Sequence, residues 1–275
     1  MMESKYKSIS RIGEGSFGSV YLIKDEKDRS FALKKIRVDP FEVDRSLKEI
    51  EVMKKFIHPN LVKIYDSYFD EGNELLEIVM EYCEEGDLFN YYKSKNKELS
   101  VDEIIRIFRQ IAIAFIVMNV KGVFHRDLKP ENILIGKGMV IKVADFGCAR
   151  SVNSVEISKM DAFSLDMGTP IYASPEQLKN EKYSSKCDVW SAGCMLYLIY
   201  YGFHPFLDSR AHNTLKLIRK MTEGKDIELK SDTDPTVARL LSLTLLYEDR
   251  ERASWRELWL SRLFAPKVRN IESFI

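Results

Sequence analysis

The sequence predicts an α+β fold of two lobes: a small β-rich N-terminal lobe with one main helix, and a larger α-helical C-terminal lobe. Up to about residue 80, short runs with alternating apolar residues are separated by turn-forming residues, which is typical of antiparallel strands. Beyond that point the apolar residues recur at helical spacing. We expect a short connector at residues 81–86, and a cleft between two lobes is a preferred place for a ligand.

The N-terminal lobe is expected to hold several short strands and one helix. The strand-like runs are Tyr6–Arg11, Ser19–Lys24, Ser30–Arg37, Leu61–Tyr68 and Leu75–Glu81. A helical apolar spacing from Val43 to Met53 interrupts them, and His58-Pro59-Asn60 stops it. The lobe would therefore occupy about residues 6–80.

The C-terminal lobe is expected at about residues 87–264, followed by a short tail at 265–275. Ser100 and Glu103 form a capping-box pattern that opens a long apolar helix. That helix is expected to run through Met118. Further helical segments are expected at Ser185–Tyr201, Thr236–Leu246 and Trp255–Leu263.

Composition and charge exclude several classes of protein. Of the 275 residues, 45% are hydrophobic and 31% charged, which is a globular composition. Forty-two basic and forty-two acidic residues cancel, which argues against a nucleic-acid partner and against a polybasic membrane-binding segment. No apolar run is long enough to span a bilayer, and the N-terminal residues resemble no secretory signal. We expect no membrane anchor, and four reduced cysteines in a cytoplasmic or nuclear protein.

A glycine-rich segment follows the first expected strand. Residues 13–20 read Gly-Glu-Gly-Ser-Phe-Gly-Ser-Val. In a dinucleotide-binding fold the third glycine would open a helix, whereas here strand-like residues follow it. Two interpretations stay open at this point: a turn whose backbone N–H groups fold over phosphates, and a plain hairpin turn.

A lysine on the third expected strand favours the phosphate interpretation. Lys34 follows Ala32 and Leu33, and an inward-facing lysine needs an anionic partner. Glu49 on the expected helix is the candidate, which would leave Lys34 ready for the α- and β-phosphate oxygens. Taken alone, Glu49 is better explained as an exposed helix residue.

Three residues with complementary chemistry share the loop after the long apolar helix. The carboxylate of Asp127 could accept a hydroxyl proton, and Lys129 could neutralise a phosphoryl group during transfer. The amide oxygen of Asn132 could bind a hard cation. Asp145, which begins Asp-Phe-Gly, would supply a second oxygen ligand for magnesium.

These motifs together resemble those of the eukaryotic protein kinase superfamily, of the serine/threonine type. The resemblance extends from about Tyr6 to Phe264, with the motifs in the order of the family. They are the glycine loop, Lys34, Glu49, His125-Arg126-Asp127, Asp145-Phe146-Gly147, Ser174-Pro175-Glu176 and Asp188-Val189-Trp190. The resemblance implies the bilobal protein-kinase fold and Mg²⁺-dependent transfer of the ATP γ-phosphoryl group to serine or threonine hydroxyls of proteins. A catalytically inactive pseudokinase or scaffold is the alternative, and it would be expected to lack one of the key residues that are present here.

The resemblance also assigns roles to individual residues. Asp127 would be the catalytic base, Lys129 would stabilise the transferring group, and Asn132 and Asp145 would hold Mg²⁺. The expected ATP-binding residues are Ile12, Gly13, Glu14, Gly15, Ser16, Phe17, Gly18, Val20, Ala32, Lys34, Glu49, Met80, Glu81, Cys83, Asp87 and Leu134.

Within the ATP-binding set, Met80 would be the gatekeeper and Asp87 would reach the ribose. The backbones of Glu81 and Cys83 would bond adenine. The residues expected to sandwich the ring are Val20, Ala32 and Leu134. A stack between the lobes is expected from Met53, Ile64, His125 and Phe146, although ordinary core packing explains Met53 and Ile64 equally well.

An activation segment is expected to extend from Asp145 to Glu176. Arg126 and Arg150 near it imply a pocket for a phosphate on the protein itself. Ser164 is one candidate for that phosphorylation. The alternative is that Asp166 supplies a constitutive negative charge.

Two further contacts are implied by the resemblance. Thr169 would hydrogen-bond the catalytic aspartate and lysine, and Glu176 would form a structural ion pair with Arg252. Arginine-directed relatives use acids at three positions, and this chain has Asp87, Glu131 and Leu198 there, so the third acid is replaced by a leucine. We therefore expect a weak requirement for basic residues upstream of the acceptor, with apolar contacts instead.

Within the superfamily, residues 169–176, 193–197 and 251–258 look most similar to the Unc-51-like and NIMA-related kinases. The resemblance implies protein substrates with serine or threonine acceptors and a regulatory partner protein. We expect the catalytic domain to be monomeric.

Overall fold

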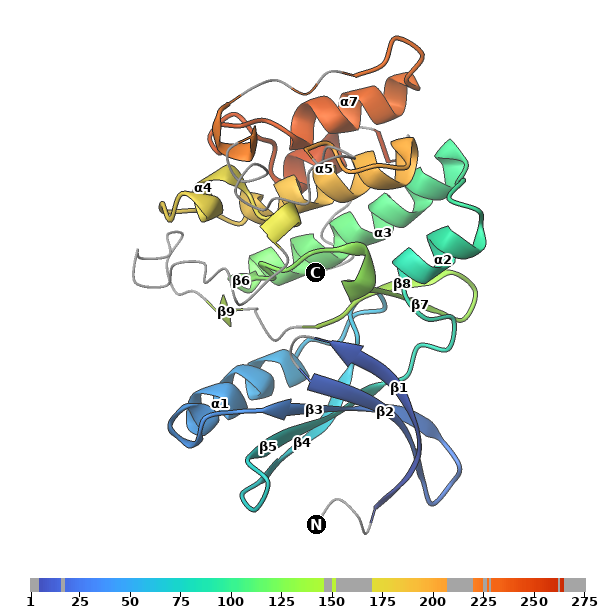
Figure 1. The fold of residues 1–275 in the computed structure, drawn as a ribbon, viewed down its shortest axis with the longest axis vertical. Coiled ribbons are helices and arrows are strands. Elements are labelled where there is room, and N and C mark those ends of the chain that lie inside the picture. Colours follow the sequence, from blue (N-terminus) through green and yellow to red (C-terminus); the bar gives the residue numbers. More distant parts are fainter. Residues whose placement is uncertain are drawn as a thin grey trace.

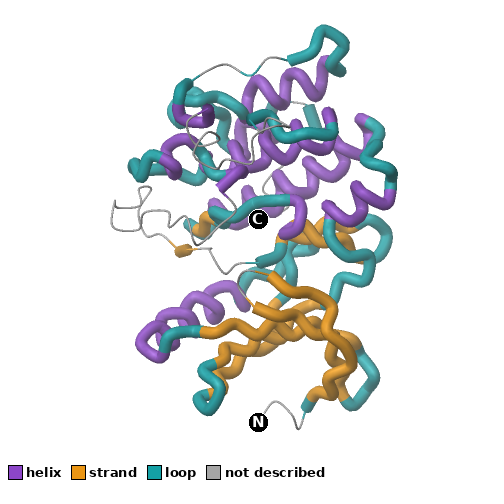
Figure 2. Tube along the Cα trace, in the orientation of Figure 1, coloured by secondary structure: helices purple, strands orange, loops and turns teal. Residues whose placement is uncertain are grey.

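The computed structural model confirms the predicted fold class. Figure 1 shows a lobe built on a β-sheet below a larger helical lobe, and Figure 2 shows most strands in the first and most helices in the second. The described residues are 5–15, 18–145, 150–151, 170–206, 220–224, 227, 229–261 and 263–264. None of the helices among them is both long enough and apolar enough to cross a membrane.

The N-lobe is a five-stranded antiparallel sheet in the order β1-β2-β3-β5-β4. The strands are β1 (Tyr6–Gly15), β2 (Gly18–Asp25), β3 (Ser30–Arg37), β4 (Ile64–Asp70) and β5 (Leu75–Glu81). A 3-10 turn, Pro40–Glu42, leads into the single long helix of this lobe, α1 (Val43–Lys54). β4 begins later than expected because Leu61 forms an isolated bridge with Val143 of the other lobe.

The strand register determines which face of the sheet meets the C-lobe. Val20 lies opposite Lys34, and Lys34 lies opposite Ile78, so these three side chains share one face. Ala32 lies opposite Met80 on the same face. Because side chains alternate along a strand, this face presents the predicted ATP-binding residues together.

The glycine-rich segment joins β1 and β2. Gly15 pairs with Gly18 at the tip of this hairpin, which excludes the helix expected of a dinucleotide-binding fold. Gly18 has a φ of +136°, and a Cβ there would lie 1.9 Å from the Lys35 carbonyl oxygen. A close backbone approach therefore requires glycine at this position.

The C-lobe is built on helices, with short strands at the face towards the N-lobe (Figure 1). The helices are α2 (Leu88–Ser94), α3 (Val101–Val120), α4 (Pro175–Leu178), α5 (Lys186–Tyr201), α7 (Pro235–Thr244) and α8 (Trp255–Leu260). The strands are β6 (Val123–Phe124), β7 (Ile133–Gly136), β8 (Val140–Val143) and β9 (Arg150–Ser151). The 3-10 turns are Pro130–Asn132 and Pro170–Tyr172. The predicted capping box of Ser100 and Glu103 is present at the start of α3.

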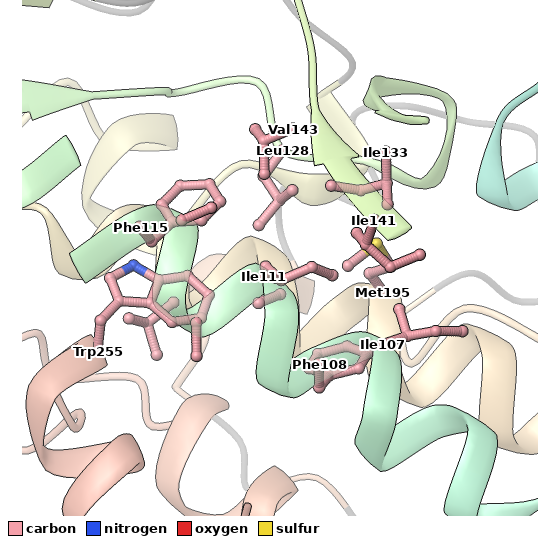
Figure 3. Close-up of a cluster of buried hydrophobic side chains, with 14 of the residues drawn as sticks. Ile107, Phe108, Ile111, Phe115, Leu128, Ile133, Ile141, Val143, Met195 and Trp255 are labelled. Atoms are coloured by element: carbon pink, nitrogen blue, oxygen red, sulfur yellow. The ribbon is translucent and has the colours of Figure 1, made fainter. Parts of the chain in front are cut away.

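The hydrophobic core supports the segment that carries the predicted catalytic residues. Phe115 of α3 stacks on Trp255 of α8, with ring centroids 4.6 Å apart. Leu128 and Ile133 are fully buried in the same core, on either side of the loop around Asn132. Figure 3 shows their side chains directed into the cluster. Burial of each such side chain contributes about 1.5–3 kcal/mol, so the loop is anchored at both ends.

Candidate active site

A cleft of about 480 Å³ lies between the two lobes. It gathers most of the residues predicted to bind ATP, together with the three polar residues Lys129, Asn132 and Asp145. The predicted ATP-binding residues that line it are Ile12, Gly13, Glu14, Gly18, Val20, Ala32, Lys34, Met80, Glu81, Cys83, Asp87 and Leu134. Gly15 ends β1, while Ser16 and Phe17 lie outside the described residues.

Four lining residues were not predicted to bind ATP or to take part in catalysis: Tyr82, Gly86, Glu131 and Ala144. Tyr82 and Gly86 belong to the predicted connector between the lobes. That position in the chain is the sequence feature that could have placed them at the cleft. Gly86 has a φ of +76°, which favours glycine at the bend into α2. Ala144 precedes Asp145, and only the fold brings its backbone to the cleft.

Lys34 forms an ion pair with Asp145 across the cleft. Their side chains are 10% and 23% exposed, so the lysine has the anionic partner that burial requires. The predicted contact between Lys34 and Glu49 is wrong for this conformation. Glu49 instead lies beside Arg45 of its own helix, with Arg45 Nε 3.5 Å from Glu49 Oε1. Lys34 therefore pairs with the carboxylate of Asp145, and Glu49 pairs with Arg45 within α1.

A second, smaller cavity of about 130 Å³ lies between α1 and the sheet. Lys34, Glu49 and Asp145 all border it, so these three charged residues surround one space. Met80, the predicted gatekeeper, lines both this cavity and the main cleft. Met53, expected in the stack between the lobes, also lines the small cavity and is buried.

The apolar part of the cleft is made by both lobes. Cys83 is buried with Ala144, and Leu134 packs against this small cluster. Burial raises the pKa of the Cys83 thiol to about 12, so the side chain is a neutral thiol. Among the described residues, the Cys83 backbone N–H has no hydrogen-bond partner, which leaves it to a ligand. Asp87 lines the cleft while its carboxylate accepts from the Asn90 N–H at 2.8 Å, capping α2.

The predicted catalytic residues meet at one carboxylate. Asp127 Oδ2 accepts from Lys129 Nζ at 2.9 Å and from Asn132 Nδ2 at 3.0 Å. Asn132 Nδ2 also donates to the Asp127 carbonyl oxygen at 2.7 Å. The amide nitrogen of Asn132 is thereby held by Asp127, so the side-chain oxygen is the atom that could bind a metal ion.

Asp188 of α5 stabilises the backbone that leads into the loop of Asp127. Its fully buried carboxylate accepts from the backbone N–H groups of His125 at 2.9 Å and Arg126 at 2.7 Å. Burial raises the pKa of Asp188 despite these two donors. His125 Nε2 lies 2.8 Å from the carbonyl oxygen of Ala144, which connects the loop to the residue before Asp145. No role was expected for Asp188 beyond its membership of a motif, because the contact depends on tertiary structure.

The predicted ion pair between Glu176 and Arg252 is present and buried. Arg252 Nη1 and Nη2 lie 2.7 and 3.1 Å from the carboxylate oxygens of Glu176. Arg126 donates to the Tyr183 hydroxyl at 3.2 Å. The remaining predictions for the activation segment fall on residues outside the described part of the chain: Phe146, Ser164, Asp166, Thr169 and the side chain of Arg150.

The oxygen atoms available to a metal ion come from Asn132 and Asp145, which line the same cleft. The described residues contain no group of three or more His, Cys, Asp or Glu side chains suited to a metal. Mg²⁺ is commonly held by one or two protein oxygens together with substrate phosphates. The donor set therefore fits Mg²⁺ arriving with a nucleotide.

Comparison with known proteins places the chain among kinases. Residues 6–264 match the family model described as protein kinase domain. Serine/threonine-protein kinase Nek5 of Homo sapiens is 34% identical over 256 residues, which cover 91% of this chain and 35% of Nek5. Serine/threonine-protein kinase Nek2 of Homo sapiens is 31% identical, with 97% of this chain and 62% of Nek2 covered.

Serine/threonine-protein kinase ATG1a of Arabidopsis thaliana is 32% identical, with 95% of this chain and 42% of ATG1a covered. The chain therefore spans less than two thirds of the length of each of these relatives. The expected similarity to NIMA-related and Unc-51-like kinases is confirmed.

Proposed function

The chain belongs to the protein kinase domain family, and from that premise we propose that it is a serine/threonine protein kinase using ATP and Mg²⁺. The observation that carries the proposal is the convergence of Lys34, Asn132 and Asp145 at one interlobe cleft, with the Asp127 carboxylate hydrogen-bonded to Asn132. The names of the similar proteins, all serine/threonine-protein kinases, support an aliphatic hydroxyl as the acceptor.

Nucleotide binding would use both lobes. Val20, Ala32 and Leu134 offer apolar surfaces to the base, and the Cys83 N–H, which has no hydrogen-bond partner in the described part of the chain, offers a donor. The ammonium of Lys34 would meet phosphate oxygens, for which it must leave or share Asp145. A buried ammonium group is destabilising without an anion, so the incoming phosphates would replace part of what Asp145 supplies.

Proton transfer would centre on Asp127. The residue is 6% exposed and its carboxylate is held by Lys129 and Asn132, so its orientation is fixed before substrate arrives. An acceptor hydroxyl bound beside it would be oriented towards the phosphorus atom and would give its proton to this carboxylate. Lys129 lies close enough to the same carboxylate to neutralise charge on the transferring group.

Magnesium would be held by the Asn132 oxygen and the Asp145 carboxylate. When bound, the ion would neutralise phosphate charge during transfer. Asn132 is pre-set for this role because Asp127 holds its amide nitrogen. Asp145 has a φ of +61°, a left-handed conformation that orients its carboxylate towards Lys34.

The proposal extends to the recognition of substrate sequences and to the regulation of the kinase. Leu198, partly buried at the end of α5, supports apolar rather than basic recognition upstream of the acceptor. Phosphorylation of Ser164, or the fixed charge of Asp166, would act on Arg126. We also propose a regulatory partner protein, a monomeric catalytic domain and a cytoplasmic or nuclear location, without a membrane anchor or nucleic-acid partner.

A phosphate-transfer assay tests the proposal. The purified protein is incubated with γ-labelled ATP, Mg²⁺ and myelin basic protein, and labelled phosphoamino acids are separated. We expect label on serine or threonine, a loss of at least about a hundredfold in Asp127→Asn, and no loss in the exposed control Asp232→Asn. An inactive wild type, label on tyrosine, or equal activity of Asp127→Asn would contradict the proposal.

A further inference from the structure

An ion pair joins the two lobes at the connector end of the cleft. Lys142 Nζ lies 2.8 Å from Glu81 Oε1. Glu81 is the last residue of β5, where the N-lobe sheet ends, and Lys142 lies in β8 of the C-lobe (Figure 1). The side chain of Lys142 is only 13% exposed and that of Glu81 27%, so solvent screens this pair less than an ordinary surface pair.

The pair also engages a third segment, the turn between α1 and β4. Lys142 Nζ donates to the carbonyl oxygen of Pro59 at 2.9 Å. Glu81 Oε2 accepts from the backbone N–H of Lys63 at 3.3 Å, and the Glu81 N–H donates to the Lys63 carbonyl oxygen at 2.9 Å. Backbone hydrogen bonds already join these segments, from Val62 N–H to the Val143 carbonyl oxygen and from Val143 N–H to the Asn60 carbonyl oxygen, both at 2.9 Å. The side chains of Lys142 and Glu81 add a second set of contacts between the end of β5, the turn before β4 and the β8 strand.

The β7–β8 hairpin places the side chain of Lys142 beside Glu81. Lys142 lies opposite Leu134, so its side chain starts from the same face of the hairpin as a residue that lines the cleft. Its stem passes over Gly136, where an added Cβ would lie 3.6 Å from Lys142 Cε. The hydrocarbon stem packs on the hairpin while the ammonium reaches Glu81.

We propose that Lys142 is a positioning residue of the nucleotide site, which fixes the connector through Glu81. This inference rests on the proposed function, since it takes ATP to be the occupant of the cleft. Glu81 and Cys83 line the cleft, so a restraint on Glu81 sets where this backbone meets the base. Preorganised binding groups lose less conformational freedom when the ligand binds. Without Lys142 the half-buried carboxylate loses its cation, the connector relaxes, and nucleotide dissociates faster.

Nucleotide release measures this effect directly. Lys142→Met keeps most of the stem and removes the charge, and dissociation of a fluorescent ADP analogue is followed by stopped flow. We expect dissociation to be about three- to tenfold faster, the KM for ATP to rise by a similar factor, and kcat to stay unchanged. Lys137→Met, at an exposed lysine in the turn of the same hairpin, is the matched control and should change none of these.

A double-mutant cycle shows whether the ion pair carries the effect. If it does, Glu81→Gln alone should also speed dissociation, and Glu81→Gln combined with Lys142→Met should add little. Additive effects of the two substitutions would mean that Lys142 acts through something else, and would overturn the inference. Equal dissociation rates for Lys142→Met and Lys137→Met would overturn it too, as would a fall in kcat with no change in nucleotide affinity.

Hydrogen exchange tests the same restraint without nucleotide. In the ligand-free protein, Lys142→Met should speed amide exchange in peptides covering 59–63 and 81–86 relative to Lys137→Met. Unchanged exchange would refute the restraint itself. If wild type failed to bind the ADP analogue, the proposed function would fail, while the exchange result would still decide whether Lys142 holds the connector.

Discussion

Removal of Arg252 should destabilise the C-lobe more than neutralisation of its partner Glu176, although both changes break the same buried ion pair. Within the described part of the chain, the Glu176 carboxylate accepts hydrogen bonds only from Arg252, at 2.7 and 3.1 Å. The Arg252 guanidinium has further acceptors at 3.0 to 3.2 Å, which are the backbone carbonyl oxygens of Leu246, Lys186 and Tyr247. The two partners are therefore unequally dependent on each other.

This asymmetry sets the expected magnitudes. Arg252→Leu leaves the carboxylate of Glu176, a residue that is 6% exposed, without its cation, and loss of one partner of a buried pair costs about 3–5 kcal/mol. Glu176→Gln leaves the guanidinium with its carbonyl acceptors and an amide oxygen in place of the carboxylate. That change should cost about 1–2 kcal/mol, the scale of one weakened hydrogen bond.

Urea unfolding followed by tryptophan fluorescence gives both free energies. The expected order is wild type, then Glu176→Gln, then Arg252→Leu, with unchanged m-values. The double variant Glu176→Leu/Arg252→Leu should be more stable than Arg252→Leu alone, because it removes the stranded carboxylate. A reversed order of the single variants, or a loss below about 1 kcal/mol in Arg252→Leu, would refute the reasoning.

Three other changes test separate parts of the structure. Gly18→Ala should lower both the melting temperature and ATP affinity, since the new Cβ would meet the Lys35 carbonyl at 1.9 Å; unchanged values would contradict the close approach. Burial lowers the pKa of His204 to about 4 from its usual 6.5, so the unfolded chain takes up a proton first as the pH falls. The free energy of unfolding should drop by up to about 3 kcal/mol between pH 6.5 and 4 in urea titrations, and His204→Phe should lose this component. Burial and the nearby Lys142 ammonium hold the pKa of His58 below its usual value, so Lys142→Met should raise it in an NMR titration; no rise would place the ammonium elsewhere.

Local patterns predicted the parts of the fold that have long or chemically distinctive signals. The capping box of Ser100 and Glu103 begins a helix with a sustained apolar spacing, and the structure starts α3 there. The catalytic loop was predictable because Asp127, Lys129 and Asn132 lie within six residues of one another. Residues so close in sequence need only one tight turn to share a carboxylate.

Short elements and long-range contacts escaped prediction for physical reasons. α2 and α4 have too few turns for a periodic apolar pattern, and the strand pairing of β7 with β8 depends on contacts outside each strand. The partner of Lys34 depends on the position of a whole helix. Glu49 and Asp145 offer the same chemistry, so residue types cannot choose between them, and the choice follows from the packing of α1.

The charge balance of the cleft explains why a divalent cation belongs to the proposed reaction. Among the described residues that line it, two are cationic and five are acidic. They are Lys34, Lys129, Glu14, Glu81, Asp87, Glu131 and Asp145. Arg11 and Lys142 compensate Glu14 and Glu81 from outside the lining, which still leaves more acid than base around a polyanionic nucleotide. The two lysines of this lining would therefore not neutralise the phosphates alone, and a cation held by Asp145 and Asn132 would supply the missing positive charge where the acids are concentrated.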